Sequence, residues 1–180
     1  MDRLLPIVQK SDIPGQYQDT PVGHLLEYQN LEKPFDTFSK AELLIGMCMD
    51  YRKHLRIPDY FAFIIRSGGA NLRYSEFKVS FAIAVGGVRH IALIGHTQCG
   101  MVNIASRKDE MIQGLVDGAG WSAEQAEEHF NQFGPMFEIG NEVDFVMSEA
   151  VRLRKRYPKI PVAPLLYKVE DSALYVINED

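Results

Sequence analysis

The two cysteines of the chain lie in short segments that also carry histidine and charged residues. Cys48 opens the segment "CMDYR", and His96 and Cys99 belong to "HTQCG". Zinc favours thiolate and imidazole ligands in tetrahedral geometry, and His96 and Cys99 are close enough in sequence to reach one ion from a single turn. Cys48 completes three ligands if its strand lies beside the strand that ends at His96. Three protein ligands and one open position are typical of a catalytic zinc site, whereas structural sites usually have four.

Asp50 and Arg52 matter because of the charge of such a site. Two thiolates cancel the charge of Zn²⁺, so that a bound hydroxide would leave the cluster negative, and a nearby arginine would offset that charge. An aspartate can accept the hydroxide's proton in a hydrogen bond and so orient its lone pair. We expect residues 41–50 to form a strand, on which positions 48, 50 and 52 would project to the same side. Without the cysteine, an ordinary surface ion pair would explain Asp50 and Arg52.

Other readings of these residues have less support. A cysteine phosphatase would need arginine where His54 or Ala105 stands, and Met101 occupies the lysine position of a phosphate-binding loop. No G-x-G-x-x-G motif is present. A single buried cysteine is most often a small hydrophobe, so either cysteine alone would indicate little. The combination of all five residues favours a metal site.

The elements that must position these residues alternate along the chain. After an irregular arm over residues 1–22, the pattern of apolar residues predicts helices over 22–33, within 72–88, over 101–116, from 122 and over 142–158. It predicts strands over 41–50, 60–69, 90–96, 164–169 and 173–177. Strands that alternate with helices indicate an α/β fold with a mostly parallel sheet flanked by helices. In such sheets ligands bind beyond the carboxyl ends of the strands, where Cys48 and His96 fall.

The composition is that of an ordinary globular protein. The chain has 180 residues, which we expect to form one domain (1–180), with 46% hydrophobic and 24% charged residues. The net charge of −5 argues against a nucleic-acid partner, and the basic run 152–159 is most simply a solvated helix face. The apolar run in residues 1–12 is too short for a signal peptide, and no run is long enough to span a membrane. We therefore expect a cytoplasmic protein with reduced thiols.

Taken together, "CMDYR" and "HTQCG" resemble the paired motifs of the β-class carbonic anhydrases. Three other segments extend the resemblance over roughly residues 22–177. "RSGGAN" (66–71) is similar to an Arg-Asn-Ala-Gly-Asn loop of that family, "SFAIAVGGVRHIALIGHTQCGM" to its helix–strand–ligand segment, and "PLLYKVEDSALYVI" to its closing hairpin. The short chain is nearest to the compact, archaeal or bacterial-type members.

The resemblance implies a fold, a metal and a reaction. It implies Zn²⁺ held by Cys48, His96 and Cys99, with Asp50 and Arg52 as a catalytic pair. The implied reaction is the reversible hydration of CO2 to bicarbonate and a proton by zinc-bound hydroxide. The family also implies a homodimer or a multiple of dimers, in which residues 1–35 would form an arm and helix packing on a partner subunit.

The sequence departs from the family pattern around the expected substrate pocket. Tyr51 stands where serine is usual, and Ser67 and Gly68 replace the asparagine and alanine of the loop. With Gly69 and Gly100, these residues are our candidates for the pocket. They leave open a hydrolase acting on CS2 or COS at the same zinc site. A non-catalytic zinc-binding interaction module is the third alternative. Segment 111–141 is hard to align with the family, and we expect it to be a helical elaboration.

Overall fold

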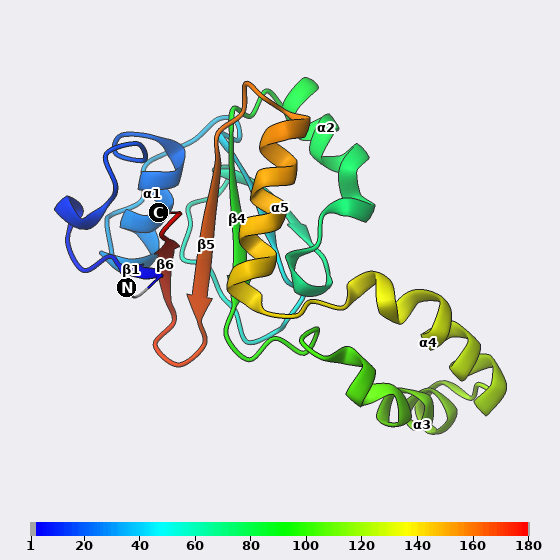
Figure 1. Ribbon diagram of the computed structural model, residues 1–180. Coiled ribbons are helices and arrows are strands. Elements are labelled where there is room, and N and C mark those ends of the chain that lie inside the picture. Colours follow the sequence, from blue (N-terminus) through cyan, green and yellow to red (C-terminus); the bar gives the residue numbers. More distant parts are fainter. Residues whose placement is uncertain (1–2, 180) are drawn as a thin grey trace.

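The computed structural model describes residues 3–179, which form one six-stranded sheet with helices on both faces (Figure 1). The strands are β1 (Leu4–Pro6), β2 (Leu43–Met47), β3 (Ala62–Arg66), β4 (His90–His96), β5 (Val162–Lys168) and β6 (Ala173–Ile177). Their order across the sheet is β1-β6-β5-β4-β2-β3. β3, β2, β4 and β5 run parallel to one another, whereas β6 pairs antiparallel with both β5 and β1. The predicted α/β class with a mostly parallel sheet is confirmed.

Five α-helices connect or cover the strands: α1 (Pro21–Asn30), α2 (Glu76–Ala84), α3 (Lys108–Ala119), α4 (Ala123–Phe137) and α5 (Glu142–Arg156). Short 3-10 helices cover Lys10–Asp12, Gly68–Ala70, Arg73–Ser75 and Ile104–Arg107. Side-chain oxygens of Thr20, Ser122 and Asn141 accept backbone N–H groups of the first turns of α1, α4 and α5. Such caps satisfy amides that have no partner within the helix, which is why these helices begin where they do.

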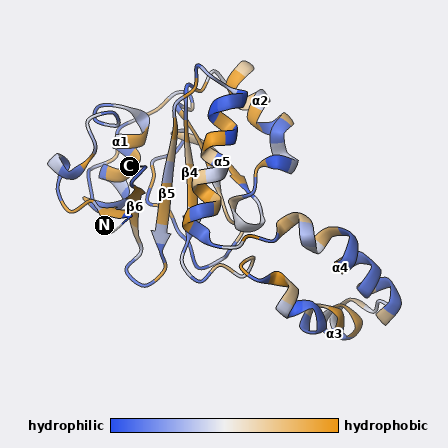
Figure 2. Cartoon of the chain, viewed as in Figure 1, coloured by the Kyte–Doolittle hydropathy of each residue, from blue (hydrophilic) through white to orange (hydrophobic). Residues whose placement is uncertain are grey.

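The sheet separates two apolar cores. Alternate residues of each central strand point to opposite faces, so that Ile45 and Ile94 pack under α1 while Leu44 and Leu93 pack under α2 and α5. Figure 2 shows these central strands as mostly hydrophobic. α5 approaches β4 closely at Gly95, where a Cβ atom would lie 2.6 Å from Cγ2 of Val146. The absence of a side chain there lets the helix that precedes β5 close over β4.

The structure corrects three boundaries. The arm 1–22 is not wholly irregular, since Leu4–Pro6 forms β1 and pairs with β6. The first long strand ends at Met47 rather than at residue 50. The helix expected over 101–116 begins as a 3-10 turn at Ile104 and becomes α-helical only from Lys108. Each error concerns an element end, where hydrogen bonds to distant residues decide the outcome.

α1 belongs to the body of its own chain. Leu25 and Leu26 are fully buried in the core on one face of the sheet. Whether residues 1–35 also contact a partner subunit stays a prediction.

α3 and α4 form a hairpin that extends away from the sheet (Figure 1). It accounts for the helical elaboration expected over 111–141. No helix in the described part of the chain is long and apolar enough to cross a membrane.

Candidate metal centre

The three predicted ligands come from two neighbouring parallel strands. β2 and β4 pair with Met47 opposite Ile94, so the residues that follow both strands emerge at the same edge of the sheet. Cys48 directly follows β2, and His96 is the last residue of β4. Cys99 lies in the turn after β4, whose backbone carries a positive φ of 57° at Gln98. This turn folds Cys99 back towards His96.

The ligand atoms of Cys48, His96 and Cys99 all lie within 4.8 Å of one another, and all three residues are buried. The two sulfur atoms are 3.9 Å apart. Two thiolates at the usual zinc–sulfur distance of about 2.3 Å in a tetrahedral site would be separated by about 3.8 Å. The donor set and its spacing therefore fit zinc.

His96 presents the correct nitrogen to such an ion. Its Nδ1 lies 2.8 Å from the backbone oxygen of Thr97, and because a carbonyl only accepts, Nδ1 carries the proton. Nε2 is then left with a lone pair, and it is buried without any hydrogen-bond partner in the described residues. An imidazole held by one nitrogen and open at the other is the usual arrangement of a metal-ligating histidine.

The two thiols are coupled to each other. The hydrogen bond from Cys99 lowers the pKa of Cys48, and the His96 ring and the Asp50 amide act in the same direction. The same bond, with burial, raises the pKa of Cys99. Because a metal ion binds the thiolate form of cysteine, a dication bound here would displace the protons of the pair.

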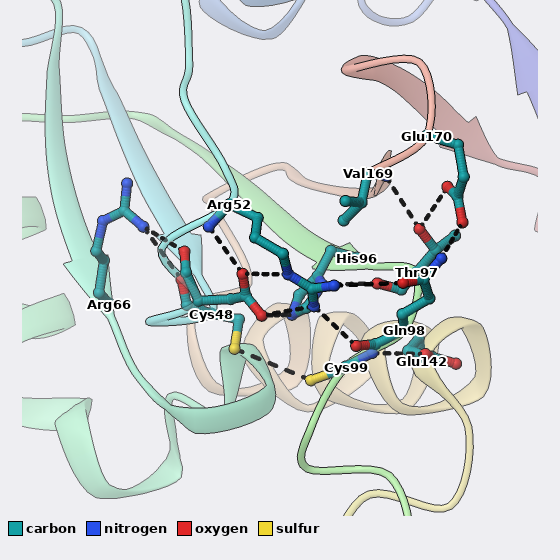
Figure 3. Close-up of polar contacts among 11 residues, drawn as sticks. Cys48, Arg52, Arg66, His96, Thr97, Gln98, Cys99, Glu142, Val169 and Glu170 are labelled. Atoms are coloured by element: carbon teal, nitrogen blue, oxygen red, sulfur yellow. Dashed lines mark hydrogen bonds and ion pairs between the residues drawn. The ribbon is translucent and has the colours of Figure 1, made fainter.

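Asp50 and Arg52 form a two-pronged ion pair next to the ligands (Figure 3). Arg52 Nε donates to Asp50 Oδ1 at 3.0 Å, and its NH2 group donates to Oδ2 at 2.8 Å. The Arg52 backbone amide also donates to Oδ1, at 2.9 Å. These bonds from Arg52 hold the pKa of Asp50 well below its usual range, so it is a carboxylate at neutral pH. Asp50 Oδ2 lies 3.9 Å from His96 Nε2, which brings the carboxylate to the edge of the ligand cluster.

The structure corrects our explanation of why Asp50 and Arg52 lie together beside Cys48. We expected a strand to direct positions 48, 50 and 52 to one side, but β2 ends at Met47 and the chain turns through residues 51–52. The turn lets the amide of Arg52 reach the side chain of Asp50. Arg66 stabilises this turn, because its guanidinium donates to the backbone oxygens of Cys48 and Asp50 at 3.4 Å each.

Two polar residues that sequence reasoning missed lie against the ligands. The Cys99 amide donates to Glu142 Oε1 at 3.1 Å. Lys53 is only 1% exposed, and its Nζ has no hydrogen-bond partner among residues 3–179. Burial lowers the pKa of Lys53, against the attraction of Cys48 and Asp50, which raises it. No local pattern in the sequence marks either residue, since both depend on contacts between separate elements.

The candidate pocket residues divide into two groups. Gly68 and Gly69 are buried, and a Cβ atom on either would lie 3.0 Å from Met101 or Ile139. Ile139 packs in the same small cluster as Cys48 and Cys99, so this glycine loop backs the metal centre. Tyr51, by contrast, is 85% exposed. Ser67 and Gly100 are partly exposed, and a Cβ atom on Gly100 would meet no other atom.

Comparison with known proteins agrees with this geometry. A family model described as carbonic anhydrase matches residues 62–170, which include His96 and Cys99 but begin after Cys48, Asp50 and Arg52. This match covers more than half of the chain, and the chain belongs to the β-carbonic anhydrase family. A search of curated proteins finds no match.

Solved structures of the family share the fold. A carbonic anhydrase from Glaciozyma antarctica is 18% identical, with a TM-score of 0.62 over 90% of this chain and 98% of that one. A carbonic anhydrase from Streptococcus mutans is also 18% identical, with a TM-score of 0.59 over 90% and 98% of the two chains. The apo form of a carbon disulfide hydrolase is 20% identical, with a TM-score of 0.55 over 92% of each chain. At these identities the likeness establishes the fold alone.

Proposed function

We propose that the protein is a zinc-dependent carbonic anhydrase that converts CO2 reversibly to bicarbonate and a proton. The observation that carries the proposal is the cluster of three buried ligand atoms within 4.8 Å, with the Asp50–Arg52 pair at its edge. Cys48, His96 and Cys99 would hold the ion. When bound, zinc supplies a Lewis acid that makes hydroxide available from water near neutral pH.

The chain's own residues orient the reacting groups. Asp50 keeps its charge because Arg52 binds both of its oxygens, and a carboxylate at this edge can accept a proton from the attacking oxygen in a hydrogen bond. That bond would direct a lone pair of the nucleophile towards the carbon of CO2. His96 is fixed by Thr97 in the tautomer that leaves Nε2 available. The buried loop at Gly68 and Gly69 packs on Met101 and Ile139, and Ile139 packs in turn with Cys48 and Cys99.

The test is stopped-flow CO2 hydration with a pH indicator, on protein of known zinc content. We expect rapid hydration by the wild type and a loss of about 100-fold in kcat in Asp50→Ala, the scale of a proton-handling group. Zinc content should stay unchanged in the variant. A zinc-loaded wild type that hydrates no CO2 would overturn the proposal.

The same preparation separates the two alternatives. Sulfide release from CS2 or COS by a protein inert to CO2 would identify a hydrolase at the same site. Inertness to all three substrates at full zinc occupancy would favour an interaction module without turnover.

We also propose that the protein is a homodimer built on the outer edge of β3. β3 is an edge strand of the sheet, and α2 beside it carries Phe77 (83% exposed) and Phe81 (49% exposed). Phe63 and Ile64 of β3 continue this apolar surface, which is hollowed by a groove of about 200 Å³. An unpaired apolar edge of this kind promotes aggregation unless it is covered, and a second copy of the chain is the simplest cover.

A cytoplasmic location would suit the site, because a reducing compartment keeps both thiols free to bind metal.

A further inference from the structure

The turn that follows β4 also contacts the Asp50–Arg52 pair, through hydrogen bonds between Arg52 and Gln98. While one edge of the Arg52 guanidinium binds Asp50, its NH2 group also donates to the backbone oxygen of Gln98 at 3.0 Å. Its NH1 group donates to the side-chain oxygen Oε1 of Gln98 at 3.3 Å. Arg52 therefore lies between Asp50 and Gln98 and is hydrogen-bonded to both, and Figure 3 shows its contact with Gln98.

The side-chain amide of Gln98 can present its oxygen to Arg52 only because its nitrogen is bound elsewhere. Gln98 Nε2 donates to Glu170 Oε1 at 2.8 Å. The other carboxylate oxygen, Oε2, accepts from the Thr97 hydroxyl at 2.8 Å, and that hydroxyl oxygen accepts from the Val169 amide at 3.0 Å. A carboxylate accepts hydrogen bonds and donates none, so Glu170 fixes which end of the Gln98 amide faces Arg52.

The backbone at Gln98 depends on the same contacts. Its φ of 57° lies in the left-handed region, which a residue with a side chain keeps only where its surroundings impose it. This conformation directs the Gln98 carbonyl to Arg52. The hydrogen bond from Thr97 lowers the pKa of Glu170, so the carboxylate stays ionised at neutral pH.

We propose that Glu170 is a positioning residue for the Asp50–Arg52 pair and acts on it through Gln98. Its side chain hydrogen-bonds to Thr97 and Gln98, which lie beside the ligands in sequence, and it lies just beyond β5, on the connection to β6. By fixing the Gln98 amide, it holds Arg52 and, through Arg52, the direction of the Asp50 carboxylate. The expected effect on the rate rests on the proposed function, whereas the expected effect on Arg52 does not.

Three variants test the proposal. Glu170→Gln keeps the shape of the side chain but leaves it one accepting end, so it cannot accept from both Thr97 and Gln98. Thr97 and Gln98 then compete for that one oxygen, so the orientation of the amide at position 98 is no longer fixed and its NH2 group can turn towards Arg52. The double variant Gln98→Glu with Glu170→Gln reverses the pairing. The introduced glutamine donates to the introduced glutamate and still accepts from Thr97, while the glutamate accepts from Arg52.

Asp171→Asn is the matched control. Asp171 lies in the same connection, where it accepts from the Ala173 amide and the Tyr175 hydroxyl. No hydrogen bond links it to Thr97 or Gln98. A loss caused only by a loosened turn would therefore appear in this variant too.

The first readout is the mobility of Arg52, measured in the zinc-free protein from ¹⁵N relaxation of its Nε–H group and assigned with Arg52→Lys. We expect an order parameter near the rigid value of about 0.85 in the wild type and in Asp171→Asn, falling towards about 0.6 in Glu170→Gln. The double variant should return it to the wild-type value. An Arg52 that is equally rigid in wild type and Glu170→Gln would overturn the proposal.

The second readout is CO2 hydration. In Glu170→Gln we expect kcat to fall about tenfold, with KM and zinc content unchanged, and the double variant should recover most of the loss. An equal loss in Asp171→Asn, or no recovery in the double variant, would assign Glu170 a role in the turn alone. If the wild type itself hydrates no CO2, the relaxation measurement still decides the question.

Discussion

Replacing Lys53 with methionine should stabilise the zinc-free protein. The Lys53 side chain is 1% exposed and its ammonium makes no hydrogen bond in the described residues. Burying a polar group without a partner costs roughly 1–3 kcal/mol in protein mutational data. The charges of Cys48, Asp50 and Cys99 attract Lys53, but burial has the larger effect on its pKa, which is lowered. Methionine is similarly long and has no charge to desolvate, so we expect a gain of about 2 kcal/mol.

The gain should depend on pH in one direction. In the unfolded chain Lys53 titrates near pH 10.5, and in the folded protein its pKa is lower. Below the folded pKa the amine is protonated in both states, and the folded state bears the full cost of the buried charge. As the pH rises through the folded pKa towards 10.5, the amine is neutral in the folded state and the cost of the buried charge disappears, which leaves only the smaller cost of a buried neutral amine. The advantage of Lys53→Met should therefore be greatest at neutral pH and shrink towards pH 10.5.

Urea unfolding of the zinc-free protein at pH 7 and at pH 10 measures this difference. A gain of about 2 kcal/mol corresponds to a rise in Tm of about 4–8 °C for a chain of this size. Lys159→Met is the control, because Lys159 is exposed and its replacement should change the free energy of unfolding by less than about 0.5 kcal/mol. If Lys53→Met were destabilising at neutral pH, the attraction between Lys53 and the thiolates would outweigh burial, and our reading of this residue would be wrong.

Two further outcomes test the ligand set and the apolar edge. Cys48→Ser should weaken zinc binding by more than about 100-fold, measured in competition with a chelator. The loss should exceed the 10- to 100-fold loss in affinity that follows when a residue hydrogen-bonded to a metal ligand is replaced. If the variant still held one zinc per chain after the competition, the assignment of Cys48 as a ligand would be wrong. Phe81→Glu should convert the dimer into a monomer in analytical ultracentrifugation, because it places a charge in the proposed interface. Phe133→Glu on α4 is the control and should leave the dimer intact. A wild-type protein that is already monomeric would refute the proposed interface.

The cluster of Cys48, His96 and Cys99 could be predicted because its arrangement is largely local. His96 and Cys99 lie in one turn, and the parallel order of β2 and β4 follows from the alternation of strands and helices. Parallel strands carry their carboxyl ends to one edge of a sheet, so Cys48 had to arrive near His96 once the two strands became neighbours. The predicted cluster is present at this edge.

The outward face of α2 was not predictable from its own sequence. The helical spacing of Phe77, Phe81 and Val85 predicts a helix correctly, and such a stripe would ordinarily face the core. In the structure these side chains are exposed, and Val79 and Ala82 are buried instead. A helix whose two sides are both apolar gives no indication of which side meets its own sheet.

The contacts that orient Asp50 could not be predicted from the sequence, for a different reason. Arg52 meets Gln98, and Gln98 meets Glu170, across three separate elements. What aligns them is the register of β4 and β5, in which His96 lies opposite Tyr167 and the Thr97 amide donates to the Tyr167 oxygen at 3.1 Å. A shift of that register by one residue would turn each β5 side chain to the other face and move Glu170 away from Gln98. The position of the candidate metal ligands depends on strand order, which a sequence pattern can indicate. The orientation of Asp50 depends on strand register, which a sequence pattern cannot indicate. Because the register of β4 and β5 brings Glu170 to Gln98, we expect this carboxylate to affect the orientation of Asp50 although it lies far from it in the sequence.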